Sequence, residues 1–181
     1  PGPLADSWRL ESWRPVQDSA EYAAGRVFAQ DISSQTLVSD FTAEAGRIFG
    51  GVEGRTVLDL CAAPGGKSSG LAWNGWHVLA TDRQAETRTS RERFELLVET
   101  ARRIGAGLQG AGKMEIVERK NVDSLGLVDA AWVDAPCTGT GTWRRNPDAK
   151  WRTRPGALEQ PPGHLAHRER IVDHHHANIG D

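Results

Sequence analysis

The chain has 181 residues, of which 38% are apolar and 25% charged, enough apolar material for one ordinary hydrophobic core. Its formal charge of -2 excludes a protein that coats nucleic acid through bulk positive charge, and two cysteines are too few for a disulfide framework. All apolar runs are short, so we expect neither a membrane-spanning helix nor a signal peptide, and a reducing cytoplasm is the simplest setting.

The first part of the chain leads into a predicted helix. Residues 1–24 mix tryptophan, proline and charge without a clean period, and we interpret them as an irregular lead-in. Because the chain starts at Pro1 and not at methionine, we expect it to be a piece of a longer protein. Apolar residues recur at helical spacing over residues 33–49, with serines before them as caps and two glycines after them.

The stretch TVLDLCAAPGGK, residues 56–67, organises the rest of the chain. A β-branched and aliphatic run breaks there into small residues, Pro64 and two glycines, which predicts a strand over 56–60 and a tight turn. In an α/β protein such a turn lies at the carboxyl end of a strand, where ligands bind, and glycine lets a ligand approach the main-chain N–H groups. A helix is expected after Lys67, with its N-terminal N–H groups facing a ligand oxygen.

Further strands and a long helix follow. Residues 77–81 predict a second strand ending at Asp82, where nucleotide-binding α/β folds place an acid that accepts both ribose hydroxyls; a helix N-cap is the alternative. Residues 83–104 predict a helix whose arginines are solvated and whose core stripe is Phe94, Leu97, Val98, Ala101 and Ile104. Strands are predicted over 114–118 and 130–134. Alternating strands and helices indicate a doubly wound, mostly parallel α/β sheet.

The pattern changes after the fourth strand. Residues 135–181 contain no further run of strand-forming apolar residues, so we expect the sheet to be incomplete at its C-terminal end. Residues 155–181 form a tail with five of the six histidines. Its DHHHAN segment resembles the D-H-H-x-x-N signature of DHH phosphoesterases, but the other metal-ligand motifs of that family are missing from the sequence, and we predict no metal site.

Two motifs together point to a family. DLCAAPGGKS resembles the cofactor loop of the Nop/Sun family of S-adenosylmethionine-dependent RNA (cytosine-5) methyltransferases, which includes the bacterial Sun/Fmu-type ribosomal RNA enzymes. VDAPCTGTGTWRRNPDAKW, residues 133–151, is similar to its proline-cysteine motif, and FAQDISSQTLV, residues 28–38, is a weaker match. The resemblance implies a Rossmann-like class I methyltransferase domain over residues 25–154, the cofactor S-adenosylmethionine and an RNA substrate, expected to be ribosomal RNA.

The resemblance also implies a set of cofactor-binding residues. Asp134 matches the aspartate that the family places between the cofactor's amino group and the target base; capping of its turn is the alternative. Where the family has an aspartate near the adenine this chain has Asn121, whose amide can both donate to and accept from an adenine edge. The full set is Cys61, Ala62, Ala63, Pro64, Gly65, Gly66, Lys67, Asp82, Asn121 and Asp134.

Cys137 and Asp134 are the candidate catalytic residues. Carbon 5 of cytosine is a poor nucleophile, so a cysteine thiolate usually adds to carbon 6 and the resulting enamine attacks the methyl group. In the family this thiol belongs to a threonine-cysteine motif after the fifth strand, whereas the proline-cysteine motif, matched by Cys137, assists product release. The sequence has no threonine-cysteine pair, and Cys61 is better explained as a small buried hydrophobe. We therefore expect no turnover by this chain alone, although Cys137 could in principle take over as nucleophile.

A basic and aromatic segment follows Cys137. TWRRNPDAKWR, residues 142–152, suits phosphate contacts and stacking on unpaired bases; the alternative is an exposed loop with its tryptophans packed inward. The predicted RNA-binding residues are Arg144, Arg145, Asn146 and Lys150. We expect methyl transfer to carbon 5 of cytosine in ribosomal RNA by a cytoplasmic monomer. A catalytically inactive RNA- or cofactor-binding remnant and a small-molecule methyltransferase are the alternatives, the latter disfavoured by the Arg-Arg-Asn-Pro segment.

Overall fold

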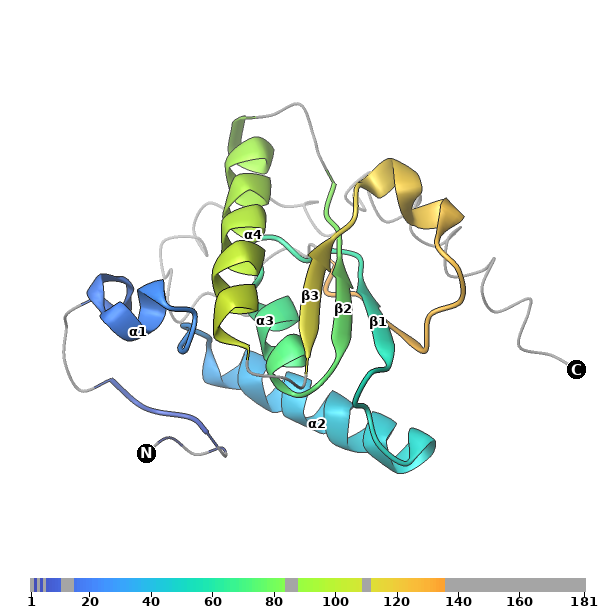
Figure 1. The fold of residues 1–181 in the computed structure, drawn as a ribbon, viewed down its shortest axis with the longest axis horizontal. Coiled ribbons are helices and arrows are strands. Elements are labelled where there is room, and N and C mark those ends of the chain that lie inside the picture. The colour runs from blue at the N-terminus through green and yellow to red at the C-terminus, as the bar shows by residue number, and fades with distance from the viewer. Residues whose placement is uncertain are drawn as a thin grey trace, which may run out of the picture. The chain divides into compact units, whose positions relative to one another are not determined.

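Four short strands form an all-parallel sheet in the computed structural model (Figure 1), which describes residues 2, 4, 6–10, 15–83, 88–108 and 112–135. The strands are β1 (Thr56–Asp59), β2 (His77–Ala80), β3 (Lys113–Ile116) and β4 (Ala130–Trp132). Their order is β3-β2-β1-β4, so β1 is paired on both sides, with Leu58 opposite Leu79 and Ala131. This order is that of one half of a Rossmann-like sheet, which confirms the predicted fold class.

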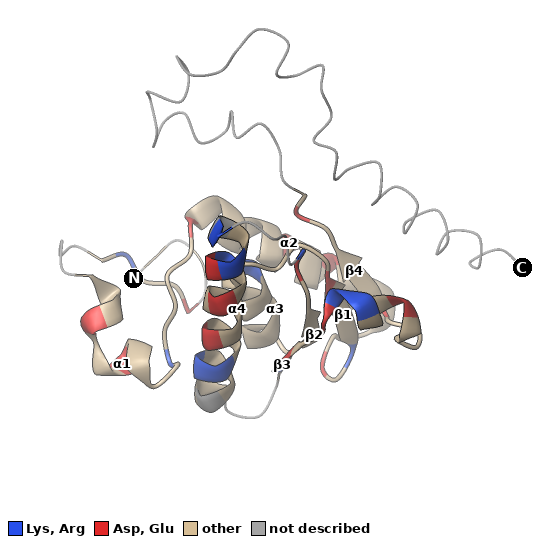
Figure 2. Ribbon diagram, turned by 90° about the horizontal axis from the view of Figure 1, so that it is seen from above, with Lys and Arg blue, Asp and Glu red and all other residues tan. Residues whose placement is uncertain are grey.

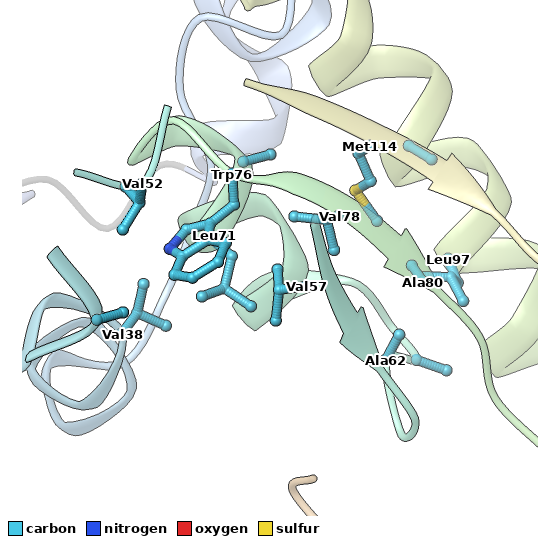
Figure 3. Close-up of a cluster of buried hydrophobic side chains, with 14 residues drawn as sticks. Val38, Val52, Val57, Ala62, Leu71, Trp76, Val78, Ala80, Leu97 and Met114 are labelled. Carbon is cyan, nitrogen blue, oxygen red and sulfur yellow. The ribbon is translucent and has the colours of Figure 1, made fainter. Parts of the chain in front are cut away.

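Three helices cover one face of the sheet. They are α2 (Ile32–Phe49), α3 (Gly66–Trp73) and α4 (Arg88–Gly107), and Figure 3 shows side chains from all three meeting those of the strands. The buried cluster includes Val38, Val57, Leu71, Trp76, Val78, Leu97 and Met114. Trp76 is stacked on Phe41 of α2 and donates its indole N–H to the Thr42 hydroxyl at 3.1 Å, which satisfies the one polar atom of this large side chain.

The opposite face of the sheet carries a smaller apolar cluster. Because side chains alternate along a strand, Leu58 and Leu79 point away from the helices, where they join a second apolar cluster with Leu60 and Val122. Val122 belongs to η2 (Arg119–Ser124), the short 3-10 helix drawn in gold in Figure 1. Within the described residues no α-helix lies on this face.

Two expectations about helices were wrong in detail. Asp31, not a serine, caps α2 by accepting from the N–H of Ser33 at 3.0 Å, because the serines already lie inside the first turn. On α4, Val98 is 44% exposed and does not belong to the core stripe, whereas Arg103 is only 6% exposed. Tertiary contacts override the helical period at both positions.

Arg103 is buried because the N-terminal lead-in packs over it. The lead-in contains η1 (Val16–Asp18) and α1 (Ala20–Ala23). The guanidinium of Arg103 donates to the carbonyl oxygens of Tyr22 and Val27, both at 3.0 Å, and lies 3.7 Å from the centre of the Tyr22 ring. A buried guanidinium with two acceptors and an aromatic face fixes the path of the chain into α2.

The sheet and its helices belong to one unit, residues 1–134. Of the following residues the structure describes Ala135. Cys137, Arg144, Arg145, Asn146, Lys150 and the tail of residues 155–181 therefore lie outside the described residues, and the predictions made for them stay predictions. None of the helices that are described is long and apolar enough to cross a membrane.

Candidate methyl-donor site

The candidate site lies at the carboxyl edge of the sheet, around the loop that joins β1 to α3. We call residues 60–65 the glycine loop. Its main chain is hydrogen-bonded to the segments on both sides. The N–H of Leu60 donates to the carbonyl oxygen of Trp132 in β4 at 3.1 Å, and the N–H of Ala62 donates to the carbonyl oxygen of Thr81, directly after β2, at 3.0 Å. The loop closes on itself through the N–H of Gly65 and the carbonyl oxygen of Ala62 at 2.6 Å. The ends of β1, β2 and β4 thus meet at one place, as predicted for a parallel sheet.

Gly65 is where the loop turns into α3. Its φ of 108° lies in the region that favours glycine. A Cβ at this position would stand 2.9 Å from Cγ2 of Thr100 and 3.3 Å from Cδ1 of Leu97, both on α4. Gly65 therefore serves two purposes, because it allows the turn and lets α4 pack directly against the loop.

Asp59, the last residue of β1, holds the inside of the loop. Its side chain is 1% exposed, and its two oxygens accept from the hydroxyl of Ser68 at 2.6 Å and from the N–H of Cys61 at 3.2 Å. Burial raises the pKa of Asp59 to about 6; the two hydrogen bonds oppose the rise, and the charges of Asp134 and Asp82 add to it. Asp59 was not among the residues predicted for the site, although an acidic residue ending a buried strand before a glycine turn was the available signal.

Asp82 links the loop to the end of β2. One carboxylate oxygen accepts from the N–H of Ala63 at 2.9 Å and the other from the N–H of Arg83 at 2.6 Å. A carboxylate has about four acceptor positions, so these bonds leave acceptor capacity on both oxygens. The predicted ribose-binding residue is therefore in contact with the predicted cofactor loop and still able to accept from hydroxyls.

Lys67 and Asp134 bring the first motif and the start of the second together. The ammonium of Lys67, in the first turn of α3, lies 2.6 Å from a carboxylate oxygen of Asp134, which follows β4. The Lys67 side chain is 26% exposed and that of Asp134 is 53% exposed, so the ion pair remains open to solvent on the Asp134 side. Two residues predicted separately, 67 positions apart in the sequence, share one edge of the sheet.

The remaining predicted residues have simpler surroundings. Asn121 lies in η2, after β3, and is exposed; its N–H donates to the carbonyl oxygen of Glu118. Cys61 packs against the second apolar cluster. No group of three or more histidine, cysteine or acidic residues in the described part of the chain is arranged to hold a metal ion.

Two contacts with the loop were missed by sequence reasoning. A guanidinium nitrogen of Arg93 on α4 donates to the carbonyl oxygen of Ala63 at 2.6 Å. The side-chain amide of Gln30 donates to the carbonyl oxygen of Gly66 at 3.1 Å. Arg93 had no distinguishing signal among the arginines of α4, whereas Gln30 belongs to the weaker upstream match.

Charge on the described surface is mixed. Figure 2 shows acidic and basic residues alternating along α4, and several of them pair within the helix, as Arg88 does with Glu92 and Arg102 with Glu99. Pairs of this kind neutralise each other locally. The RNA contacts predicted for the basic segment of residues 142–152 therefore stay a prediction.

Known proteins resemble this chain over most of its length. Residues 48–171 match the family model described as 16S rRNA methyltransferase RsmB/F. A ribosomal RNA small subunit methyltransferase B from Citrobacter koseri is 32% identical over 158 residues, which cover 82% of this chain and 32% of that protein. Its namesake from Pectobacterium carotovorum is 33% identical over 162 residues, covering 87% and 34%. The chain thus spans about a third of the length of the curated relatives it matches.

A solved structure adds evidence on the fold. The crystal structure of PH0851 matches with a TM-score of 0.55 and 23% identity, over 81% of this chain and 30% of that one. At this identity the likeness bears on the fold alone, and it agrees with the parallel α/β sheet described above.

Proposed function

The chain belongs to the RsmB/F family of 16S rRNA methyltransferases, and from this premise we propose that it binds S-adenosylmethionine at the glycine loop, as part of an enzyme that methylates carbon 5 of cytosine in ribosomal RNA. The observation that carries the proposal is the bond between the N–H of Ala63 and the carboxylate of Asp82. It joins the two elements that a nucleoside-binding α/β site needs, a glycine turn and an acid after the second strand.

Each residue of the site has a role in this proposal. Asp82 accepts from the ribose hydroxyls, Asn121 meets the adenine edge, and the N–H groups at the start of α3 face the carboxylate of the amino acid part. The local geometry supports this fit, because Gly65 has a positive φ and Asp82 keeps acceptor capacity. When bound, S-adenosylmethionine supplies the methyl group.

For the target base, the family resemblance names Asp134 and, in the proline-cysteine motif, Cys137. Lys67 lies against Asp134 and compensates its negative charge close to the loop. Cys137, three positions further on, carries the thiol that the family resemblance assigns to product release. In this proposal Asp134 orients the target base, and Cys137 assists release of the product.

A cofactor-binding measurement tests the proposal. We expect Asp82→Asn to weaken S-adenosylmethionine binding about tenfold, because hydrogen bonds to a charged acceptor are worth about 1.5–3 kcal/mol. Calorimetry should compare S-adenosylhomocysteine with its 2′-deoxy analogue. The parent chain should prefer the ribose form, and the variant should distinguish the two less well.

The matched control is Asp40→Asn, which removes an exposed carboxylate on α2. It should leave both affinities unchanged. If Asp82→Asn keeps the full preference for the ribose form, Asp82 does not hold the ribose.

The basic segment supplies a second test. Alanine at Arg144, Arg145 and Lys150 together should weaken binding of single-stranded ribosomal RNA fragments and reduce the slope of log affinity against log salt by about 2, since each lost phosphate contact contributes about 0.7. Alanine at Arg47, Arg102 and Lys120, cations that are exposed and already paired with carboxylates, changes the net charge equally and is the control. Equal slopes for the two triple variants would count against an RNA-binding role of the segment.

A further inference from the structure

Gln30 joins the start of α2 to the first turn of α3. Its side-chain Nε2 donates to the carbonyl oxygen of Gly66 at 3.1 Å, across 36 positions of sequence, and Gly66 directly follows the glycine loop. We propose that Gln30 is a positioning residue for the methyl-donor site, which sets the orientation of the first turn of α3. The inference rests on the proposed function, since it concerns the same site.

The side chain of Gln30 extends from a rigid support. The carbonyl oxygen of Gln30 accepts from the side-chain amide of Gln35 at 3.0 Å. The next residue, Asp31, caps α2, and Val38 on that helix is 1% exposed within the core. Because both its main chain and the following helix are held, the Gln30 amide reaches α3 from a defined direction.

Gly70 makes room for this contact on α3. A Cβ at position 70 would stand 3.3 Å from both terminal atoms of the Gln30 amide and 3.3 Å from Cγ1 of Val38. These approaches are tighter than nine in ten contacts of real Cβ atoms, so the amide lies directly on the helix surface. The missing side chain of Gly70 therefore leaves the space on α3 that the Gln30 amide occupies.

The glycine loop is held from a second side by α4. Arg93 donates to the carbonyl oxygen of Ala63 at 2.6 Å, and Thr100 and Leu97 crowd Gly65. Gln30 fixes the α3 end of the loop, whereas Arg93 fixes its middle. A loop that is ordered before the ligand arrives loses less conformational entropy on binding, so each of these contacts favours affinity.

The experiment compares Gln30→Met, which has similar size but no donor, with Gln17→Met, the same substitution at an exposed glutamine of η1. Calorimetry should show S-adenosylmethionine bound about fivefold more weakly by Gln30→Met, the change that loss of one neutral hydrogen bond produces. Hydrogen exchange should be faster for the amide of Ser69, which donates to the carbonyl oxygen of Gly65 at the start of α3, and unchanged in β1. Gln17→Met should keep the parent's affinity and its exchange in α3.

Gly70→Ala perturbs the same contact from the other side. It adds a good helix former to α3 but displaces the Gln30 amide, so it too should weaken cofactor binding without lowering the unfolding midpoint by more than a few degrees. Failure of the parent chain to bind S-adenosylmethionine would overturn the proposed function and the role of Gln30 with it. Parent-like affinity in both Gln30→Met and Gly70→Ala, beside normal binding by the parent, would overturn the role of Gln30 alone.

Discussion

Replacement of Gly65 by alanine is expected to lower the free energy of unfolding by about 2 to 6 kcal/mol. A residue with a Cβ at a φ of 108° costs about 1–3 kcal/mol, and overpacking costs about as much again. The overpacking arises because the new methyl group would stand 2.9 Å from Cγ2 and 3.0 Å from Cβ of Thr100. A β-branched side chain in the interior of α4 has little freedom to move away.

The neighbouring glycine provides a matched control for this prediction. Gly66 is the first residue of α3, it is not among the glycines with positive φ, and a Cβ there would meet no heavy atom within 4 Å. Gly66→Ala should therefore stay within about 0.5 kcal/mol of the parent. Urea denaturation of the two variants measures the difference directly, and equal midpoints would show that Gly65 is not required by the turn.

Cofactor binding should separate the two glycines as well. A shift of the loop away from the new methyl group would displace the carbonyl oxygen of Ala63, to which Arg93 donates from the same helix. Gly65→Ala should thus weaken S-adenosylmethionine binding more strongly than Gly66→Ala, at a temperature where both variants remain folded. The loss of stability and the loss of cofactor affinity are then expected to arise from the same contacts, those of Gly65 with Thr100 and of Ala63 with Arg93.

Asp59→Asn is expected to increase stability at alkaline pH by up to about 3 kcal/mol and to have no such effect near pH 4. The pKa of Asp59 is about 6 in the folded chain against an ordinary value of 3.8, mainly because the carboxyl group is buried. Between these two values the folded state binds more protons than the unfolded state. The contribution of Asp59 to stability therefore falls as the pH rises through this window, and the full cost is present above about pH 6.

Asparagine can preserve the hydrogen bonds of Asp59. Its carbonyl oxygen can accept from the N–H of Cys61, and its amide can donate to the hydroxyl of Ser68, which accepts as well as donates. The variant therefore removes the buried charge and can keep a hydrogen bond to each of the two partners of Asp59. Denaturation by urea at pH 5, 6.5 and 8 should show a stability difference that grows with pH.

Other carboxyl groups also make the free energy of unfolding depend on pH. The difference in this free energy between parent and variant is therefore the quantity to compare. Asp129 has a lowered pKa, chiefly because it accepts from the N–H of Thr56, so its contribution to stability is present at neutral pH and is lost as the pH falls through its folded value. That slope is opposite to the slope from Asp59 and is common to parent and variant. Asp40→Asn, at an exposed carboxylate, is the control, and a difference for Asp59→Asn that did not change with pH would contradict the assigned pKa.

The buried carboxylate of Asp59 is connected with the proposed cofactor-binding function. Asp59 lies inside the loop, and the charges of Asp82 and Asp134 act on its pKa. A carboxylate kept at a cost in stability is a local inconsistency of the kind found at functional sites. We expect Asp59→Asn to be more stable at pH 8 and yet to bind S-adenosylmethionine no better than the parent.

The sequence by itself determined the elements whose signals are local. The run TVLDL followed by small residues and glycines specified β1, the glycine loop and the start of α3, because strand propensity and turn chemistry depend on neighbouring residues. The positions of Asp82 and Asp134 after β2 and β4 followed from the same reasoning. Parallel strands then bring their carboxyl ends to one edge, so the meeting of these residues with the loop could be expected without coordinates.

Only the tertiary structure decided the contacts that join distant segments. Arg103 is buried and Val98 is exposed because of what the lead-in and the sheet place around α4, which no helical period encodes. The raised pKa of Asp59 likewise depends on burial, and the bond from Gln30 to Gly66 on the packing of α2 against α3. Such contacts form between residues far apart in the sequence, and their energies depend on distance, solvent exposure and packing, which exist only once the chain is folded.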